Sequence, residues 1–574
     1  MLDSIYNNFK LPIQYLEGSK QIIENLDPDL ELTKANVGSE LSVYQSILKP
    51  QTIFGKQCIK PFASHYTTNV NYLQDTQKLC NTIQTIPLEK NLIENTWNTF
   101  SEIKNNNSFL ETFQYIDWSY FKWMNHISTF LLILSFYNLA SPVINLAAPM
   151  FVLIVPFFLL KAMQIPVTMH TYYTILKEQL KKHTVGQLFT QWGSVNITKK
   201  GYLLFCFSMY FYNIYQNILS CKKFYNNSTY ITNTFDTFRN YLDYSIETMT
   251  YYQNLVQDYP SYTYFSENLE YQKQNLITYY NNIINLPQKF LSFKNVAYIG
   301  ITMKNFYVIY DDDEFKDTIN YSFAFNGYVD VMINISQNVK NKIMNKVKIL
   351  DDKKTKLVFK KLYHPLLKDK PIKNNISLRK NKIITGPNAS GKTTMLKSTI
   401  INLLLCQQVG YAYLDSGTVT PFHHIHCYMN IPDTNGRDSL FQAEARRCLE
   451  IYNTMQKKSD ERHFAIFDEL YSGTNPYEAI SSAYAYLHTI SKNKNIKFIL
   501  TTHFIKLCEL FEEKKNKRIE NCFMNTTITD NYDPIYEYKI KKGISKVKGG
   551  ICVLKQLNYP TKVIEKTRAI LNNI

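Results

Sequence analysis

The sequence lacks any clustered arrangement of cysteines. Its ten cysteines are scattered along 574 residues, and no two of them form a CxxC pair. Structural zinc modules depend on such close pairs, so no zinc module is expected. Scattered cysteines are also typical of proteins in a reducing compartment. We therefore expect an intracellular protein.

An apolar leader is absent as well. Residues 1–31 are polar and contain no continuous apolar stretch, so no signal peptide is expected. Charged residues are scarce, at 19% of the chain, but Lys and Arg (64) outnumber Asp and Glu (47), and the formal net charge is +17. A positive protein favours anionic partners such as nucleic acid or acidic lipid, although a lysine-rich coding composition gives the same charge.

Charge is missing altogether from residues 123–160, and a second uncharged run covers residues 201–221. A membrane-spanning helix needs about 20 apolar residues, so the first run is long enough for two short transmembrane helices with a turn near residues 138–145. An even number of spans would leave both flanking regions on one side of the membrane. The alternative is core helices of a large domain, divided into short buried pieces by Pro142, Pro149 and Pro156.

A glycine-rich loop follows a short apolar run. Residues 382–385 (KIIT) predict a buried strand, and residues 386–394 (GPNASGKTT) match the pattern G-x-x-x-x-G-K-[ST]. The two glycines allow a tight loop whose backbone N–H groups surround phosphate oxygens, and the following helix directs its positive dipole end at the same anion. Lys392 adds a positive charge for the β- and γ-phosphates, and the Thr393 hydroxyl can bind Mg²⁺. The predicted nucleotide-binding loop consists of Gly386, Pro387, Asn388, Ala389, Ser390, Gly391, Lys392, Thr393 and Thr394.

Two later strands are predicted to bring catalytic groups to this loop. Residues 463–467 (HFAIF) form an apolar run that ends in Asp468 and Glu469. Asp468 is placed to hold Mg²⁺, and Glu469 to polarise the attacking water. A third run, residues 496–501, leads to His503, which can hydrogen-bond the γ-phosphate or that water. The candidate catalytic residues are thus Lys392, Glu469 and His503, and the candidate metal ligands are Thr393 and Asp468.

These segments resemble the MutS family of DNA mismatch-repair ATPases. The loop GPNASGKTT is similar to the family's GPNMGGKST, and FDELYSGTNPYEA (residues 467–479) is similar to MDEIGRGTSTYDG. The resemblance covers residues 360–574 in order. Its other motifs are YHP (363–365), QVGY (408–411), SLFQAEA (439–445), LTTHFIKL (500–507) and the terminal YKIKKGISKVKGGICVLKQLNYPTKVI (538–564).

The resemblance implies an α/β P-loop ATPase domain of the ABC type with a mostly parallel sheet, preceded by a mainly α-helical core and lever region. It implies ATP and Mg²⁺ as cofactors, a homodimer formed through the ATPase domain, and double-stranded DNA as a partner. In such a dimer Ser439 would reach the γ-phosphate of the ATP held by the other subunit. The turn at residues 473–475 would lie at the dimer interface, and residues 550–564 would clasp the partner subunit.

The sequence also departs from the family pattern. The loop has Ala389 and Ser390 in place of Met-Gly, and Asp438 stands where the family usually has Arg. The aromatic residue that stacks on adenine falls near Pro371 and Ile372. The Gly-x-Phe-Tyr-Glu motif of the mismatch-reading domain is absent from the sequence. We therefore do not expect mismatches to be read by the family's known route.

Four regions are predicted along the chain. Residues 1–122 are expected to form a helical, core-like region, residues 123–221 a hydrophobic helical insert, residues 222–350 a helical lever- or clamp-like region, and residues 351–574 the ATPase domain with its dimerisation element. Residues 340–382 hold fifteen Lys or Arg against three Asp. This excess predicts either a solvated helix face with loops or a surface that faces DNA or phosphate.

The segment PFHHIHC (residues 421–427) contains three histidines. Its alternation predicts a strand with His424 and His426 on one face; the alternative is a metal site, for which no partner ligands stand at matching spacing. As a whole, the sequence predicts a dimeric MutS-family ATPase with ATP-dependent DNA binding related to mismatch repair or recombination. The alternative is a membrane-attached MutS-like ATPase, associated with the membrane through residues 123–160, that acts on a protein or lipid partner.

Overall fold

The computed structural model describes residues 2–23, 26–35, 41–182, 184–190, 192–194, 196–288, 293–429, 439–529, 534–545, 547 and 550–573. They form two compact units. Unit 1 consists of Met1–Lys90, Glu247–Lys273 and Asn320–Ile574, and unit 2 of Asn91–Ile246 and Gln274–Ile319. The nucleotide-binding motifs all lie in unit 1, and both uncharged runs lie in unit 2.

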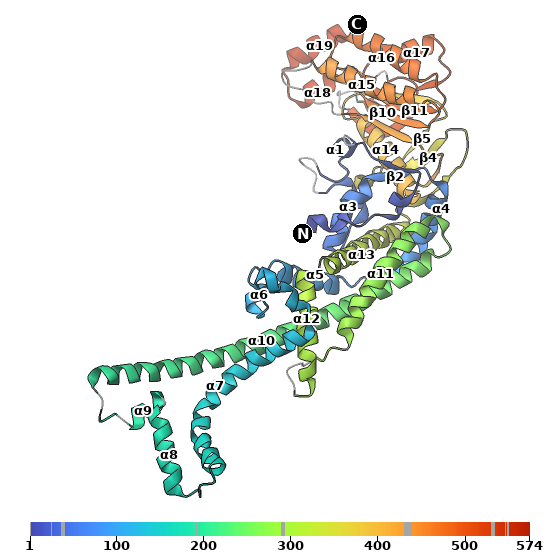
Figure 1. Ribbon diagram of the computed structural model, residues 1–574. Coiled ribbons are helices and arrows are strands. Elements are labelled where there is room, and N and C mark those ends of the chain that lie inside the picture. Colours follow the sequence, from blue (N-terminus) through green and yellow to red (C-terminus); the bar gives the residue numbers. More distant parts are fainter. Residues whose placement is uncertain are drawn as a thin grey trace. The chain divides into compact units, whose positions relative to one another are not determined.

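A six-stranded sheet organises the C-terminal part of unit 1 (Figure 1). In spatial order its strands are β13 (Pro534–Lys542), β12 (Ile519–Ile528), β6 (Asn381–Thr385), β11 (Ile496–Thr502), β10 (His463–Asp468) and β9 (His424–Tyr428). Neighbouring strands from β9 to β12 are parallel, and the edge strand β13 is antiparallel. The prediction of a mostly parallel sheet is therefore confirmed. Such a sheet places the carboxyl ends of its parallel strands at one edge, where ligands bind.

Helices cover both faces of this sheet (Figure 1). One face carries α15 (Leu440–Lys457), α16 (Pro476–Ile490) and α17 (Ile505–Glu513), whose buried apolar side chains form one core with alternate residues of β10 and β11, such as Phe467 and Leu500. α14 (Lys392–Val409) contacts β10 and β11 from the other face. α18 (Gly550–Gln556) and α19 (Thr561–Asn573) end the unit. The predicted strands and the predicted helix after the glycine-rich loop are confirmed as β6, β10, β11 and α14.

A second sheet contains much of the lysine-rich segment 340–382. Its order is β5 (Asn374–Ser377), β4 (Leu357–Leu362), β8 (Ser416–Val419), β3 (Asn345–Ile349) and β7 (Tyr411–Ala412). On β3, Val347 and Ile349 are buried, whereas Lys346 and Lys348 are exposed. The expected helix face is therefore wrong here, because the lysines alternate with apolar residues at the two-residue period of a strand.

The N-terminal elements of unit 1 are tied to the end of α14. The side chain of Gln408 donates to the carbonyl oxygens of Phe62 (3.1 Å) and His65 (2.9 Å) and accepts the hydroxyl of Tyr44 (2.6 Å). Two of these bonds are buried and the one to His65 is partly buried, and together they link the helix that begins at the glycine-rich loop to these elements. The elements are η1 (Leu2–Asn7), η2 (Pro12–Tyr15), β1 (Ser19–Gln21), α1 (Leu26–Leu30), α2 (Val43–Leu48), α3 (Ile53–Ala63), β2 (His65–Thr67), α4 (Val70–Thr82) and η3 (Ile83–Thr85). Two further 3₁₀ helices of unit 1 are η5 (Pro260–Tyr262) and η7 (Pro365–Leu367).

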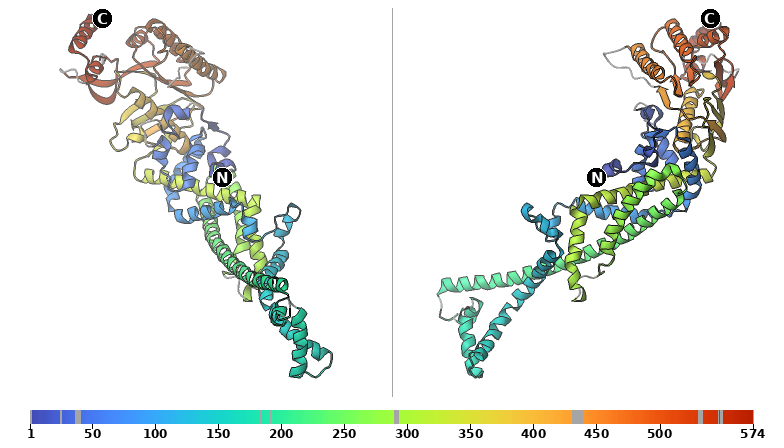
Figure 2. Two further views of the ribbon diagram at one scale, coloured as in Figure 1. Left: turned by 90° about the vertical axis from the view of Figure 1, so that its left-hand side faces the viewer. Right: turned by 45° about the vertical axis from the view of Figure 1, so that its right-hand side comes forward.

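All the regular elements described in unit 2 are helices (Figures 1 and 2). Its elements are α5 (Lys90–Lys104), α6 (Phe109–Thr112), η4 (Ser119–His126), α7 (Ser128–Ala162), α8 (Met169–Lys182), α9 (Thr184–Thr190), η6 (Phe293–Tyr298), α12 (Ile299–Asp311) and parts of α10 (Ile197–Val256), α11 (Thr263–Ile284) and α13 (Asp313–Lys340). Phe109 stacks on Tyr310, with ring centroids 4.1 Å apart. A Cβ at Gly300 would lie 2.0 Å from the carbonyl oxygen of Ser128, so only glycine lets α12 approach the start of α7 this closely.

From Ser128 onward, the first uncharged run forms one continuous helix, α7. The predicted turn near residues 138–145 is therefore wrong, and so is the predicted division into short buried pieces. Proline removes one backbone hydrogen bond and kinks a helix without always ending it, so the three prolines do not divide the run. The predicted pair of transmembrane helices is not found either: over the described residues, no helix is both long enough and apolar enough to cross a membrane.

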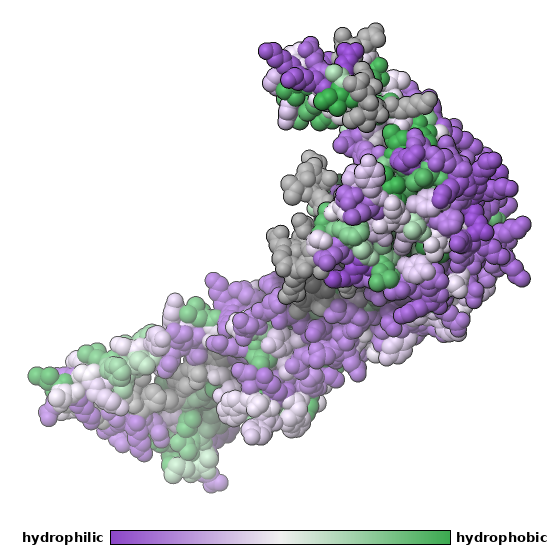
Figure 3. Space-filling model, turned by 90° about the horizontal axis from the view of Figure 1, so that it is seen from above, coloured by the Kyte–Doolittle hydropathy of each residue, from purple (hydrophilic) through white to green (hydrophobic). Residues whose placement is uncertain are grey.

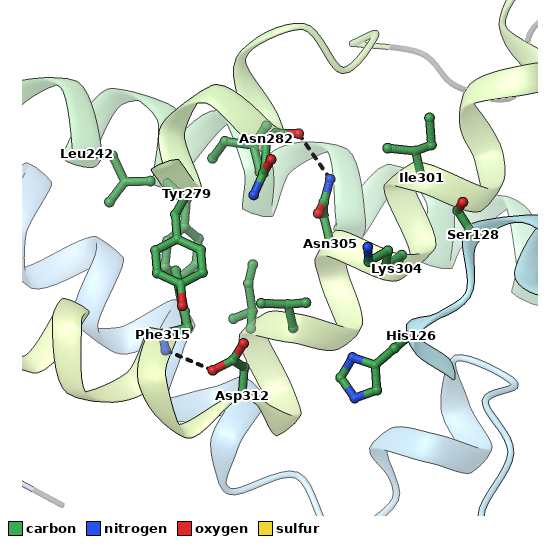
Figure 4. A pocket seen from close by; sticks show the side chains of 14 residues that line it. His126, Ser128, Leu242, Tyr279, Asn282, Ile301, Lys304, Asn305, Asp312 and Phe315 are labelled. Atoms are coloured by element: carbon green, nitrogen blue, oxygen red, sulfur yellow. Dashed lines mark hydrogen bonds between the residues drawn. The ribbon is translucent and has the colours of Figure 1, made fainter. Parts of the chain in front are cut away.

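Unit 2 also contains a pocket of about 430 Å³ between its helices (Figure 4). Asn305 donates to the carbonyl oxygen of Asn282 (3.0 Å), and Asp312 accepts the backbone N–H of Phe315 (3.0 Å). Burial, with Asp312 and Glu314 nearby, raises the pKa of Tyr279 to about 12, so its phenol stays protonated. These hydrogen bonds join α11 to α12 and cap α13, so they contribute to the packing of unit 2.

Candidate nucleotide-binding site

The glycine-rich loop joins β6 to α14. Gly391 directly precedes the helix with φ of 92°, a left-handed conformation that glycine adopts without strain. A Cβ at Gly391 would also lie 3.0 Å from Cδ1 of Tyr538 on β13. Ala389 has φ of 61° and is exposed, together with Asn388. The loop thus requires glycine at 391, where it turns into the helix beside β13.

Lys392 is folded back onto its own loop. Its Nζ donates to the carbonyl oxygens of Gly386 (3.0 Å) and Pro387 (3.2 Å) and lies 3.1 Å from Nε2 of His503. Burial lowers the pKa of Lys392, and the carboxylates of Glu469 and Asp468 act in the opposite direction. The ammonium group is therefore held in the interior of the loop, near two carboxylates.

Thr393 and Asp468 meet at the carboxyl edge of the sheet. The Thr393 hydroxyl donates to Oδ2 of Asp468 at 2.9 Å, although the two residues lie on α14 and β10. The other carboxylate oxygen, Oδ1, accepts the hydroxyl of Thr501 on β11. Thr501 is the residue paired with Asp468 in the parallel register of β10 and β11. Three oxygen-bearing side chains from three elements therefore converge on one point.

Glu469 lies directly after Asp468, and its backbone, with φ of 53°, turns there. Its Oε1 is 3.1 Å from Nε2 of His503, which follows β11. The hydrogen bond from His503 holds the pKa of Glu469 below its ordinary value, burial raises it, and the charges of His503 and Lys392 lower it further. Glu469 is thus ionised at neutral pH.

The serine segment and the turn that follows Glu469 are joined by a buried carboxylate. Ser439 is the N-cap of α15, and its hydroxyl accepts the backbone N–H of Gln442. One turn later, Glu444 is 3% exposed and accepts the backbone N–H groups of Ser472 and Gly473, both at 3.1 Å. The start of α15 is therefore fixed to the turn at residues 472–473. Asp438, the residue before Ser439, lies outside the described residues.

Two hollows flank the loop. A cleft of about 390 Å³ is lined by Gly386, Pro387, Asn388 and His503. On the other side, a more apolar pocket of about 360 Å³ is bounded by Tyr363, His364, Ile372, Gly391, Thr394, Met524 and Tyr538. Ile372 lies where the family's aromatic residue was expected, but Tyr363 and Tyr538 supply aromatic rings from other elements. The sequence position alone does not indicate these two rings, because Tyr538 is 166 residues from Ile372 in sequence.

The three histidines of β9 and β10 form a stack next to the end of α15. Nε2 of His426 lies 3.1 Å from Nδ1 of His463, whose Nε2 donates to the carbonyl oxygen of Lys458 at 2.9 Å. His424 stacks on His463 and bonds to Glu461. The predicted strand with His424 and His426 on one face is confirmed as β9. No group of metal-binding side chains is found among the described residues.

The fold and this constellation define a P-loop nucleotide-binding domain. Residues 382–574 match the family model described as MutS domain V, the ATPase domain of that family. The DNA mismatch repair protein MutS of Persephonella marina is 27% identical over 252 residues, covering 43% of this chain and 28% of the relative. The proteins of the same name from Bacteroides thetaiotaomicron and Staphylococcus epidermidis are 31% and 29% identical, covering 33% of this chain and 22% and 21% of the relatives.

The similarity is confined to part of each protein. The chain spans between 21% and 28% of the length of these relatives. The C-terminal part of the chain is therefore similar to MutS domain V.

Proposed function

We propose that the chain is an ATPase that binds and hydrolyses ATP at the loop of residues 386–394. The observation that carries the proposal is the 2.9 Å contact between the Thr393 hydroxyl and the Asp468 carboxylate. It places a hydroxyl and an acidic oxygen, the ligands that Mg²⁺ prefers, at the first turn of the helix after the loop. The same point is where the positive end of the α14 dipole favours a phosphate.

The donor set fits a nucleotide and Mg²⁺. Lys392 donates to the carbonyl oxygens of its own loop, so its ammonium already points to where phosphate oxygens would accept those bonds. The Oγ of Ser390 is buried and, within the described part of the chain, has no hydrogen-bond partner, which leaves it available to a ligand. Mg²⁺ would be held by Thr393 and Asp468 and would offset the charge of the phosphates. The apolar pocket beside Thr394 is the proposed site of the base.

Glu469 is the proposed general base. Its lowered pKa keeps the carboxylate ionised at neutral pH, so it can accept a proton from water. His503 hydrogen-bonds the carboxylate and is the proposed positioning residue, which orients Glu469 and lies within reach of Lys392.

We further propose that two copies of the chain work together on DNA. Ser439 is exposed at the N-terminus of α15, where the helix dipole favours an anion, and it is the proposed group that reaches the ATP of the partner subunit. The relatives are named DNA mismatch repair proteins, and the net charge of +17 favours binding to double-stranded DNA. The proposed role is ATP-dependent DNA binding related to mismatch repair or recombination.

The test is ATP hydrolysis and nucleotide binding by three purified forms of the full chain. Wild type should hydrolyse ATP, Lys392→Ala should lose nucleotide binding or turnover, and Glu469→Gln should bind ATP but stall as a dimer. Glu513→Gln is the matched control, because Glu513 is an exposed residue at the end of α17, outside the site. Equal turnover by Glu469→Gln and wild type would refute the assignment of the base. Absence of duplex DNA binding at low salt would refute the DNA part alone.

A further inference from the structure

One end of unit 2 exposes an unusual amount of apolar surface. We name α7, α8, α9 and residues 197–221 of α10 the arm. On α7 alone, Ile133 is 68% exposed, Met150 65% and Phe158 61%. Figure 3 shows hydrophobic surface along this end of the unit. Further exposed bulky side chains of the arm are Phe136, Ile144, Phe151, Leu153, Ile154, Phe157, Met169, Phe189, Leu204, Phe205, Met209, Phe211 and Ile218.

The helices of the arm cover little of this surface themselves. α8 lies against α7, and the hydroxyl of Tyr172 donates to the carbonyl oxygen of Leu153 at 2.8 Å. Buried apolar residues do occur, such as Leu131, Leu160 and Leu203, but among the arm's described side chains the exposed ones outnumber them. Single exposed apolar residues are normal on a protein, whereas many bulky apolar side chains exposed on the same few helices mark a binding surface.

The charged residues of the arm are nearly all lysines. Between residues 128 and 223 the sequence contains one acidic residue, Glu178, and its carboxylate is paired with Lys181 at 2.8 Å. The lysines of this segment are Lys161, Lys177, Lys181, Lys182, Lys199, Lys200, Lys222 and Lys223. The arm therefore combines exposed apolar side chains with a strong excess of positive charge.

The lysines stand at the ends of the apolar runs. Lys161 ends the uncharged stretch of α7, Lys200 precedes the second uncharged run, and Lys222 follows it. The ammonium of Lys200 lies over the ring of Trp192, 5.4 Å from its centroid. Lysine and tryptophan next to apolar runs are typical of protein segments at the boundary between lipid chains and headgroups.

We propose that the arm binds the surface of a lipid bilayer that contains anionic lipids. Its apolar side chains enter the acyl region, and its lysines contact the negative headgroups. A second copy of the arm would bring like charges together, so the lysines oppose self-association. Nucleic acid would satisfy the lysines but would leave the phenylalanine and isoleucine side chains in water. An anionic bilayer satisfies both kinds of side chain.

The test is flotation of the full-length chain with vesicles of phosphatidylcholine alone or with added phosphatidylglycerol. We expect the affinity of the chain for the anionic vesicles, measured by flotation, to be about tenfold higher than for the neutral vesicles. The quadruple variant Lys181→Glu, Lys182→Glu, Lys199→Glu, Lys200→Glu should lose this difference. The matched control carries the same change of charge on exposed lysines of unit 1: Lys457→Glu, Lys492→Glu, Lys494→Glu and Lys517→Glu.

A second variant separates apolar contact from charge. Replacing Phe151, Phe158, Phe205 and Phe211 by Ser should abolish the binding that persists at high salt, and the helical circular dichroism should be retained because these side chains are exposed. Equal loss in the unit 1 control, no flotation of a folded wild type, or equal binding to both vesicles would overturn the proposal. The proposal would also be overturned if the arm variants lost self-association or DNA binding but still bound vesicles. ATP hydrolysis by all variants should match wild type, so this proposal fails or holds independently of the proposed function.

Discussion

His503 and Glu469 are joined across the ends of two neighbouring strands, with Nε2 of His503 lying 3.1 Å from Oε1 of Glu469. The same nitrogen lies 3.1 Å from Nζ of Lys392. Nε2 either carries a proton, which it donates to the carboxylate, or has a lone pair, which accepts a hydrogen bond from the ammonium. The tautomer of His503 therefore decides which of the two groups it hydrogen-bonds. The imidazole is therefore placed between the phosphate-binding lysine and the proposed base.

Replacing His503 by Ala should move the acid limb of the pH–rate profile to higher pH. The His503 hydrogen bond is the largest cause that lowers the pKa of Glu469, so its loss lets that pKa rise. As the pH falls, a base with a raised pKa becomes protonated at a higher pH, and activity is lost at that higher pH. Turnover at neutral pH should fall about tenfold, since a hydrogen bond to a charged group is lost. ATP hydrolysis measured across pH checks this; His170→Ala, in exposed α8, should leave the profile unchanged. An unshifted acid limb in His503→Ala would contradict the assignment.

Thr501→Val should weaken the response to Mg²⁺. The Thr501 hydroxyl binds one oxygen of Asp468 and leaves the other to Thr393, so it fixes the rotamer of the proposed metal ligand. Without this hydroxyl, the Mg²⁺ concentration that gives half-maximal ATP hydrolysis should rise roughly tenfold. Thr489→Val, on the exposed side of α16, is the control. A titration of Mg²⁺ that leaves the two variants alike would show that Thr501 does not position Asp468.

The local parts of the site could be predicted from the sequence. The strand before the loop, the loop itself and the apolar run before Asp468 each have a pattern within about ten residues, and the structure has β6, α14 and β10 at those places. Thr501, Glu444 and Tyr538 could not be found in this way. Each meets the site through a partner far away in the chain, and nothing local distinguishes a threonine inside a buried strand or a glutamate on a helix.

The uncharged run shows the opposite failure. Its composition predicts either a membrane helix or a buried helix, and both predictions assume that apolar side chains find apolar surroundings within the chain or the bilayer. α7 leaves residues such as Ile133 and Phe136 exposed, so the predicted burial within the chain is wrong. The composition predicts that these side chains make apolar contacts. It does not indicate whether the same chain or another molecule provides those contacts.

Glu444→Gln should destabilise unit 1. The Glu444 carboxylate is buried and accepts three bonds, from the backbone N–H groups of Ser472 and Gly473 and from the Ser472 hydroxyl. Glutamine keeps the shape but presents an NH₂ group to a backbone donor, so about 2 kcal/mol of unfolding free energy should be lost. Urea unfolding followed by circular dichroism measures it. Glu450→Gln, on the same helix with a side chain 58% exposed, should change little, and equal midpoints for the two variants would contradict the role of Glu444.

The histidine stack should make the stability of unit 1 depend on pH. Burial, opposed by the hydrogen bond to Lys458, lowers the pKa of His463 to about 4, and burial lowers that of His426 to about 3. The unfolded chain binds protons at these residues below about pH 6.5, while the folded chain does not, so stability is complete above that pH and is lost as the pH falls toward 4.

The variant His463→Gln should reduce this dependence. It removes one group that gains a proton on unfolding, so the fall in Tm between pH 7 and pH 5 should be smaller than in wild type, even though the variant is less stable at pH 7. The dependence should persist in part, because burial also lowers the pKa of His364 to about 4. His170→Gln, whose ring is exposed on α8, should show the wild-type fall. An equal fall in His463→Gln and wild type would mean that the stack does not carry the acid sensitivity.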